Sequence, residues 1–274
     1  MHPCEQAKAG PPASVDAKPG RLLLALPAYN EAAALPRLLP RVHEAMADGG
    51  LAYEIVVVDD GSTDGTAEIL RERARSLPLH IVTHETNAGL AQTMHDALQT
   101  ALQRAGPRDV IVAMDADDTH EPALAPQMAR MVRDGHHVII ASRYCEGSQV
   151  SGVPFTRRVM SRLASYACRL LVPIPGARDY TCGYRAYDAE FLRRVWAGRP
   201  PPGEMAGFEC TLDILLALHR AGAVVGEVPL SLRYDRKPGG SKMRVGLTAV
   251  SALKLLLRFR LCRSEQAVGR SGDG

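Results

Sequence analysis

Two aspartates, Asp115 and Asp117, stand two positions apart directly after an apolar run at residues 110–114. Side chains two residues apart in extended backbone point to the same face, so the two carboxylates are neighbours. Neighbouring carboxylates repel unless a cation lies between them, and Mg²⁺ and Mn²⁺ prefer such oxygen ligands. A cation held in this way usually keeps positions open for substrate phosphates, so the pair predicts metal-assisted phosphate chemistry. The spacing leaves one alternative open, a pair of turn formers and helix caps ahead of Glu121.

Polar, turn-forming clusters follow four of the apolar runs in the chain, at residues 27–31, 59–66, 86–89 and 115–120. A polar loop after any single strand is ordinary, whereas four such loops in succession indicate a binding site. The turn at Asp59 and Asp60 can accept hydrogen bonds from a base or a ribose. Together with the aspartate pair, this turn predicts a site for a nucleoside diphosphate.

Short runs of branched apolar residues predict the strands that position these clusters. The predicted strands cover residues 22–26, 54–58, 80–83, 110–114 and 138–141, and helices are predicted between them at 31–47, 64–76, 89–104 and 121–134. Alternation of strands and helices predicts an α/β fold with a doubly wound, mostly parallel sheet. Such sheets bind ligands beyond the carboxyl ends of their strands, so the four clusters are expected to meet there.

The regular alternation stops after residue 142. Helices are predicted at 157–171, 189–196 and 208–221, a strand at 224–229 and an amphipathic helix at 245–261. Lys254 interrupts the last segment, which therefore either lies in a membrane interface or packs its apolar face on the domain. We expect one catalytic domain over residues 21–262, with mobile tails at 1–20 and 263–274.

Composition excludes several classes of protein. The 274 residues are 46% hydrophobic and 23% charged, which is typical of a globular chain. No run approaches about 18 apolar residues, and residues 1–20 hold no apolar segment, so we expect a cytoplasmic protein without a signal peptide. The six cysteines form no C-x-x-C pair. The fingerprints of dehydrogenases, P-loop NTPases, zinc proteases and serine hydrolases are absent.

Positive charge gathers in the second half of the chain. Residues 143–199 hold ten arginines and four acidic residues, and residues 233–263 hold nine basic residues and one acidic residue. This distribution favours an anionic acceptor or a membrane surface, while the small net charge of +3 does not indicate nucleic acid. The alternative is an arginine-rich, solvated surface.

Taken in order, these motifs resemble those of family 2 glycosyltransferases, most closely the dolichol-phosphate and polyprenyl-phosphate mannosyltransferases. The resemblance covers residues 22–245 and rests on the segments 27–31, 59–66, 87–90, 115–122, 142–144, 179–185, 207–209, 227–229 and 236–242. It implies a single nucleotide-sugar-binding domain of the GT-A type. Three positions depart from the common pattern: Asp118 replaces Leu, Thr119 replaces Gln or Ser, and Cys182 replaces Ser or Gly.

The resemblance also implies roles for individual residues. The nucleotide sugar is expected to contact Pro27, Ala28, Tyr29, Glu31, Asp60, Asn87, Gly89, Asp115, Ala116, Asp117, Arg236 and Lys242. The metal is expected on Asp115, Asp117 and Thr119, and the sugar and acceptor near Arg143, Asp179, Arg185, Glu209 and Ser241. The catalytic set is expected to be Asp117, Arg143, Arg236 and Lys242.

The activity implied by the resemblance is a metal-dependent, inverting transfer of mannose from GDP-mannose to a polyprenyl or dolichyl phosphate, with Mn²⁺ or Mg²⁺ as cofactor. A lipid phosphate is already ionised at pH 7, so the reaction needs no strong general base. Peripheral contact with the cytoplasmic face of a membrane is expected. Two alternatives remain: a transferase that uses UDP-glucose, another donor or a non-lipid acceptor, and a non-catalytic protein that binds sugar nucleotides.

Overall fold

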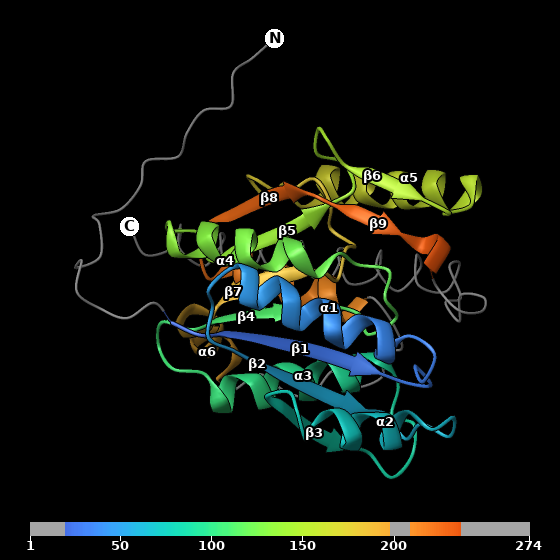
Figure 1. Ribbon diagram of the computed structural model, residues 1–274. Coiled ribbons are helices and arrows are strands. Elements are labelled where there is room, and N and C mark those ends of the chain that lie inside the picture. The colour runs from blue at the N-terminus through green and yellow to red at the C-terminus, as the bar shows by residue number, and fades with distance from the viewer. Residues whose placement is uncertain (1–19, 198–208, 237–274) are drawn as a thin grey trace.

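The central sheet of the computed structural model has seven strands, in the order β3-β2-β1-β4-β7-β5-β8 (Figure 1). The structure describes residues 20–197 and 209–236. The predicted tails, apart from residue 20, and the amphipathic segment 245–261 lie outside these ranges. The strands of the sheet are β1 (Leu22–Ala28), β2 (Tyr53–Asp59), β3 (Leu79–Thr83), β4 (Val110–Ala113), β5 (Val138–Ser142), β7 (Arg185–Asp188) and β8 (Val225–Pro229).

Helices cover both faces of this sheet. They are α1 (Leu35–Asp48), α2 (Thr66–Arg73), α3 (Leu90–Arg104), α4 (Ala125–Arg133), α5 (Phe155–Leu171), α6 (Ala189–Trp196) and α7 (Glu209–Arg220), with short 3₁₀ helices η1 (Pro122–Leu124) and η2 (Tyr234–Arg236). Helix α1 contacts α2 and α4, whereas α3 contacts α6 and α7. The predicted α/β fold with a mostly parallel sheet is confirmed.

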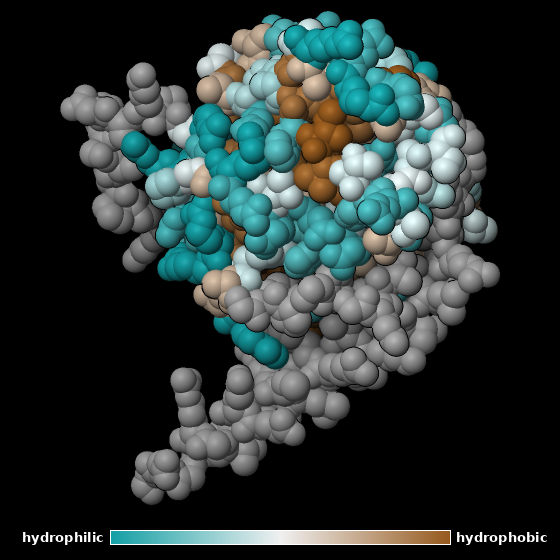
Figure 2. Space-filling view, turned by 90° about the horizontal axis from the view of Figure 1, so that it is seen from below, coloured by the Kyte–Doolittle hydropathy of each residue, from teal (hydrophilic) through white to brown (hydrophobic). Residues whose placement is uncertain are grey.

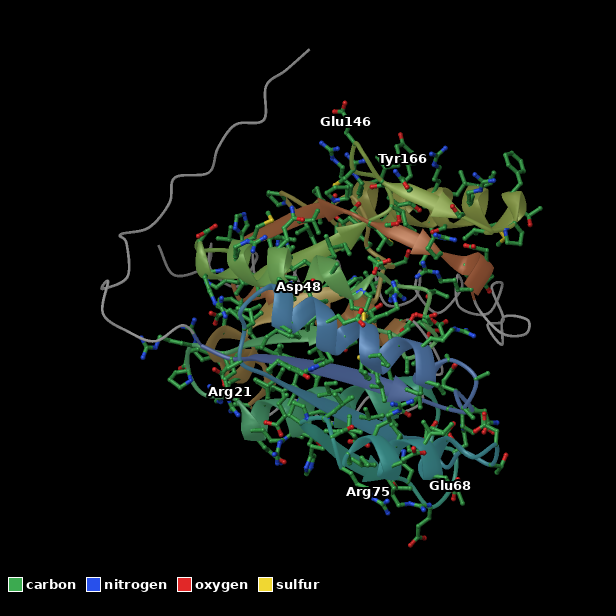
Figure 3. The ribbon with its side chains drawn as sticks, viewed as in Figure 1. Arg21, Asp48, Glu68, Arg75, Glu146 and Tyr166 are labelled. Carbon is green, nitrogen blue, oxygen red and sulfur yellow. The ribbon has the colours of Figure 1, made fainter. Side chains whose placement is uncertain are left out.

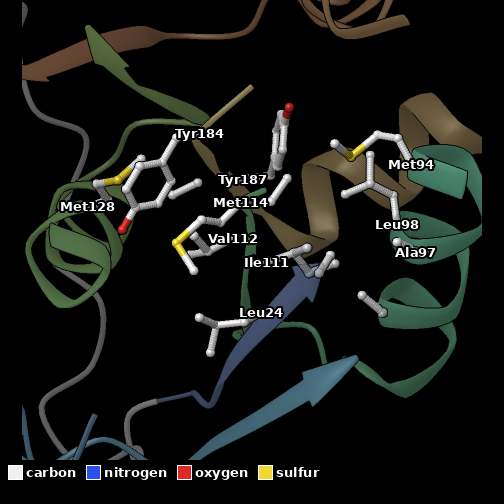
Figure 4. Close-up of a cluster of buried hydrophobic side chains, with 14 of the residues drawn as sticks. Leu24, Met94, Ala97, Leu98, Ile111, Val112, Met114, Met128, Tyr184 and Tyr187 are labelled. Atoms are coloured by element: carbon white, nitrogen blue, oxygen red, sulfur yellow. The ribbon is translucent and has the colours of Figure 1, made fainter. Parts of the chain in front are cut away.

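The middle strands are apolar throughout because helices bury both of their faces. All seven residues of β1 are buried, and so are the four residues of β4. Figure 4 shows the two sides of this core, with Met128 of α4 on one side of the strands and Met94 and Leu98 of α3 on the other. The apolar runs of the sequence are therefore the centre of the sheet.

One strand of the sheet was not predicted. Strand β7 lies between β4 and β5 and runs antiparallel to both. Its four residues begin with Arg185 and end with Asp188, whose side chain accepts a hydrogen bond from the Phe191 amide at the start of α6. So short and polar a segment resembles a turn in sequence. A second, parallel pair, β6 (Gln149–Ser151) with β9 (Ser231–Arg233), was also not predicted.

The predicted helix at residues 31–47 begins later than expected. Helix α1 starts at Leu35 because Asn30 has a left-handed φ of 55° and the next residues form a turn. The predicted helix at 121–134 likewise opens as the 3₁₀ helix η1 before α4. In both places the residues released from the helix form the loops at the carboxyl ends of strands.

Strand β3 is an edge strand, and its residues are half-buried or exposed. Figure 2, seen from below, shows a hydrophobic area within a mainly hydrophilic surface on this side of the molecule.

Among the residues that the structure describes, none of the helices combines the length and the apolar character needed to cross a membrane.

Candidate active site

The first two polar clusters are joined to each other by hydrogen bonds. The Asn30 amide donates to Ser62 Oγ at 2.8 Å, and Asn30 Oδ1 accepts from the Thr63 amide at 2.8 Å. The Glu31 amide donates to Thr66 Oγ1 at 2.9 Å. Since β1 and β2 are parallel neighbours whose arrowheads point the same way in Figure 1, their carboxyl-terminal loops form one surface.

Asp60 ties the third cluster to the second. Its carboxylate accepts from the Ala88 amide at 2.7 Å and the Gly89 amide at 3.0 Å, and it lies 2.7 Å from His84 Nδ1. The exposed Asn87 is a further contact, because its Nδ2 lies 3.5 Å from the Asp60 carbonyl oxygen. Asp60 is only 2% exposed. The loop that sequence analysis places around the nucleoside is therefore built on this one carboxylate.

His84 is a residue of this region that sequence analysis did not select. Its two ring nitrogens face two carboxylates, with Nδ1 near Asp60 and Nε2 3.1 Å from Asp96 Oδ2. Nothing in the local sequence reveals this bridge, since Asp60 precedes His84 by 24 residues. The other predicted nucleoside residues lie at the end of β1 and after it: Pro27 and Ala28 are buried, and Tyr29 and Glu31 are half-buried.

The aspartate pair lies directly beyond β4, as predicted. Asp117 Oδ1 accepts from the Thr119 amide at 3.1 Å and from Thr119 Oγ1 at 2.6 Å. Asp115 is half-buried, while Ala116 and Asp117 are buried. A Cβ at Gly183 would lie 3.9 Å from Asp115 Oδ1, so the segment that precedes β7 packs closely beside this carboxylate. The fourth cluster thus meets the 179–185 segment.

The carboxylate oxygens of Asp115 and Asp117 are suitable ligands for a divalent cation that binds together with a substrate phosphate. In residues 20–197 and 209–236, no cluster of three His, Cys, Asp or Glu side chains is arranged to hold a metal. Two carboxylates alone are the set that Mg²⁺ uses when substrate phosphates and water complete its octahedron. The Thr119 hydroxyl donates to Asp117, so it orients that carboxylate. Direct coordination of the metal by Thr119 stays a prediction.

Arg143 and Asp179, both predicted near the sugar and acceptor, form a two-point ion pair. Arg143 Nε lies 2.7 Å from Asp179 Oδ2, and Arg143 Nη2 lies 2.7 Å from Oδ1. Asp179 is fully buried. Burial by itself raises the pKa of the Asp179 carboxyl group. The charge and the hydrogen bonds of Arg143 lower this pKa by a larger amount, so the net shift is downward. The Arg143 side chain remains 21% exposed.

The backbone around Asp179 is held from β8. Glu227 Oε1 accepts from the Arg178 amide at 2.5 Å and from the Asp179 amide at 2.7 Å. The Cys145 thiol donates to Glu227 Oε2 at 3.3 Å. Glu227 belongs to one of the motifs that carry the family resemblance, and its carboxylate joins the 142–148 loop to the 178–182 loop.

Two other predicted residues of the sugar and acceptor region are buried. Arg185 is fully buried and donates to the backbone carbonyls of Thr211 and, at 2.8 Å, of Tyr180. The Arg185 guanidinium therefore helps to hold the 179–185 segment, which contains Gly183, in place. A direct contact of Arg185 with substrate stays a prediction. Glu209, the first residue of α7, is 5% exposed.

Arg236 lies at the end of the described residues, beside the loop that carries the aspartates. Its Nη1 is 3.7 Å from Glu121 Oε2, and the Arg233 amide donates to the Thr119 carbonyl at 2.9 Å. Arg37 Nη2 donates to the Arg236 carbonyl at 3.3 Å. Ser241 and Lys242 lie outside the described residues.

Two arginines of α1, Arg37 and Arg41, also contact the loop that carries the aspartates. Neither was selected from the sequence. Arg37 and Arg41 both bind Asp118, and Arg41 also binds Glu121. On a helix, such residues are usually part of a solvated face. Only the fold shows that they face the metal motif more than seventy residues away in sequence.

Comparison with known proteins places this site in a family. Residues 24–196 match the model of glycosyl transferase family 2. The undecaprenyl-phosphate mannosyltransferase of Micrococcus luteus is 31% identical, over 86% of this chain and 92% of its own length. The polyprenol monophosphomannose synthase of Mycolicibacterium smegmatis is 34% identical, over 81% of both chains. The dolichol-phosphate mannosyltransferase of Pyrococcus furiosus is 31% identical, over 89% of this chain and 64% of its own length.

Solved structures agree on the fold. Glucosyl-3-phosphoglycerate synthase from Mycobacterium tuberculosis, solved with Mn²⁺, uridine diphosphate and phosphoglyceric acid, superposes with a TM-score of 0.64. The alignment covers 88% of this chain and 78% of that chain at 20% identity, so it supports the architecture alone. The family model and the three relatives together establish that this chain belongs to glycosyltransferase family 2 and is a glycosyltransferase.

Proposed function

We propose that this enzyme transfers mannose from GDP-mannose to a polyprenyl or dolichyl phosphate, with Mn²⁺ or Mg²⁺ as its metal. The observation that carries the proposal is the position of Asp115 and Asp117. They lie at the carboxyl end of β4, between the Asp60 loop and the loop that Arg143 and Asp179 hold together. The names of the three relatives support mannose as the sugar and a polyprenyl phosphate as the acceptor.

The site can promote a single displacement at the anomeric carbon. A phosphate oxygen of the acceptor forms a bond to C1 of the sugar, while the bond from C1 to the diphosphate oxygen breaks and the nucleoside diphosphate departs. A divalent cation bound at the site would supply positive charge that neutralises that leaving group. Asp115 and Asp117 would hold this cation, and Arg236, which lies beside Glu121, adds positive charge to the same region. One in-line displacement inverts the anomeric centre.

General-base catalysis has little part in this reaction. The acceptor phosphate carries its negative charge at neutral pH, so no proton has to be removed before attack. The charged groups of the site fit this mechanism, because Arg143 and Arg236 supply positive charge and do not serve as a base. The ion pair with Asp179 raises the pKa of Arg143, against the effect of burial, so this side chain keeps its charge throughout the accessible pH range.

We further propose that α5 contacts the membrane in which the acceptor resides. Its apolar side chains Phe155, Leu163, Tyr166 and Leu170 are 61–73% exposed. Arg158, Arg162 and Arg169 on the same helix are exposed as well. Apolar side chains flanked by arginines suit the interface of an anionic bilayer. In Figure 3, Tyr166 projects from α5 at the end of the molecule opposite Glu68 of α2.

A panel of donors and acceptors tests the function. The purified chain is incubated with Mn²⁺, a polyprenyl phosphate and one of three donors: GDP-mannose, UDP-glucose or UDP-N-acetylglucosamine. The lipid products are then identified by mass spectrometry. We expect a hexosyl lipid phosphate only with GDP-mannose. A lipid product only with a UDP-sugar would contradict GDP-mannose as the donor, and no lipid product with any of the three donors would contradict a lipid acceptor. Tighter calorimetric binding of UDP than of GDP would also contradict the donor assignment.

A further inference from the structure

Asp118, between the metal-motif residue Asp117 and Thr119, adopts an unusual backbone conformation. Its φ is 59°, and among the described residues only Asn30 shares a positive φ without being glycine. A side chain in this left-handed region costs roughly 1 kcal/mol, although Asp and Asn tolerate it better than other residues. Such a conformation persists only where the surroundings hold it.

The surroundings that hold Asp118 are two arginines of α1. Asp118 is 2% exposed, Arg37 Nε lies 3.3 Å from its Oδ2, and Arg41 Nη1 binds its Oδ1. Arg37 and Arg41 are one helical turn apart and therefore lie on the same side of α1. Because a buried carboxylate is stable only when it is paired, this contact fixes the chain at Asp118.

The turn at Asp118 orients Asp117. The Thr119 amide and hydroxyl, on the far side of the turn, both donate to Asp117 Oδ1. The chain bends at residues 116–118, and the positive φ of Asp118 is part of that bend. The α1 contact can therefore act on Asp117 through the backbone at Asp118.

The same arginines reach the segment that ends in Arg236. Arg41 binds Glu121 as well as Asp118, and Glu121 Oε2 lies 3.7 Å from Arg236 Nη1. Arg37 also donates to the Arg236 carbonyl. One connected set of charges thus joins α1, the metal motif and Arg236.

We propose that Asp118 is a positioning residue, which with Arg41 of α1 sets the orientation of Asp117 for the divalent cation. The proposal rests on the metal assignment of the proposed function. Residues around metal ligands typically change metal affinity by about 10- to 100-fold when they are replaced. Loss of the Asp118 carboxylate should therefore weaken the metal rather than abolish the chemistry at saturating metal.

Binding of Mn²⁺, measured by electron paramagnetic resonance in the presence of GDP, tests the proposal. The variants are Asp118→Asn, which tolerates the left-handed conformation but lacks the charge, and Arg41→Gln, which removes the partner. The control is Glu68→Gln, because Glu68 pairs with Arg71 on the exposed surface of α2. We expect Mn²⁺ affinity to fall about tenfold in the first two variants and to stay unchanged in the control.

The double variant and the activity complete the test. If Asp118 and Arg41 act through one contact, Asp118→Asn combined with Arg41→Gln binds Mn²⁺ no more weakly than the weaker single variant. At saturating Mn²⁺, kcat of Asp118→Asn should return to within about threefold of wild type, whereas a merely unfolded fraction would lower kcat at every concentration. Should Asp118→Asn fail to fold, Arg41→Gln alone decides. Wild-type Mn²⁺ affinity in the folded variants overturns the positioning role, and no Mn²⁺ binding by wild type overturns the metal assignment itself.

Discussion

Arg143 forms a two-point ion pair with Asp179, in which both nitrogen–oxygen distances are 2.7 Å. The Arg143 amide also donates to the Asp179 carboxylate at 3.1 Å. Asp179 also accepts from the amides of Thr181 and Cys182. A fully buried carboxylate thus organises the loop after β5 and the loop before β7. The ion pair is part of the framework of the site as well as a source of positive charge in it.

Removing Arg143 should therefore damage stability and activity together. Arg143→Ala leaves the Asp179 charge buried and unpaired, a change that typically costs about 3–5 kcal/mol. Arg143→Lys keeps the charge but loses the two-point contact, so an intermediate loss is expected. Urea unfolding of the three proteins measures the loss of stability, and formation of the mannosyl lipid measures the loss of activity. Equal stability of Arg143→Ala and wild type would show that the pair does not hold the loops.

The same pair predicts how stability depends on pH. The pKa of Asp179 is lowered on folding from its ordinary value of 3.8, so its stabilising contribution is complete above that value. The contribution is lost as pH falls from about 4 toward the folded pKa, because the unfolded chain takes up the proton first. Thermal unfolding between pH 6 and 3 should show a steeper loss for wild type than for Asp179→Asn. Parallel curves would contradict the paired state.

Much of the fold was predictable because it is local. The strands from β1 to β5 are apolar runs, and their loops carry turn-forming residues, so the aspartate pair and the Asp60 loop could be placed before the structure was known. The helices of the second half, α5, α6 and α7, also lie close to the predicted ranges of 157–171, 189–196 and 208–221.

What sequence analysis missed depends on contacts between distant segments. Strand β7 exists because β4 and β5 pair with both of its edges, which four residues beginning with an arginine do not reveal. Two further contacts join residues from different loops and helices: the contact between His84 and Asp60, and the ion pair between Arg41 and Asp118. Charged residues have no periodicity that identifies such partners, so only the folded chain shows them.

Arg236 should act on the transition state more than on the bound nucleoside. Arg236→Ala removes positive charge near the leaving diphosphate, so we expect kcat to fall by roughly 10²-fold. Binding of guanosine, which lacks the diphosphate, should not change. Arg233→Ala is the matched control, because Arg233 is paired with Asp235 at the surface. Equal loss of guanosine binding and of kcat in Arg236→Ala would place this residue at the base instead.

Contact of α5 with membranes is tested by flotation with vesicles. The chain should float with vesicles that contain anionic lipid at low salt and should dissociate as salt rises, because the helix arginines are exposed. Replacing Leu163 and Leu170 by serine removes apolar contact and should reduce binding severalfold. Val224→Ser is the control, since Val224 is an exposed apolar side chain outside α5. Binding that ignores salt and lipid charge, or an unaffected double variant, would refute the proposed contact.

Formation of the mannosyl lipid as a function of Mn²⁺ concentration tests the central claim most directly. Wild type and Asp117→Asn are compared with GDP-mannose and a polyprenyl phosphate, and the lipid product is quantified by mass spectrometry. The substitution removes one charge at nearly constant volume, so the variant should stay folded and lose about 10²-fold or more in product formation. Metal-dependent mannosyl lipid from wild type, with this loss in the variant, is the predicted result. The same product yield and Mn²⁺ requirement in both proteins, or no lipid product from wild type, would contradict the account.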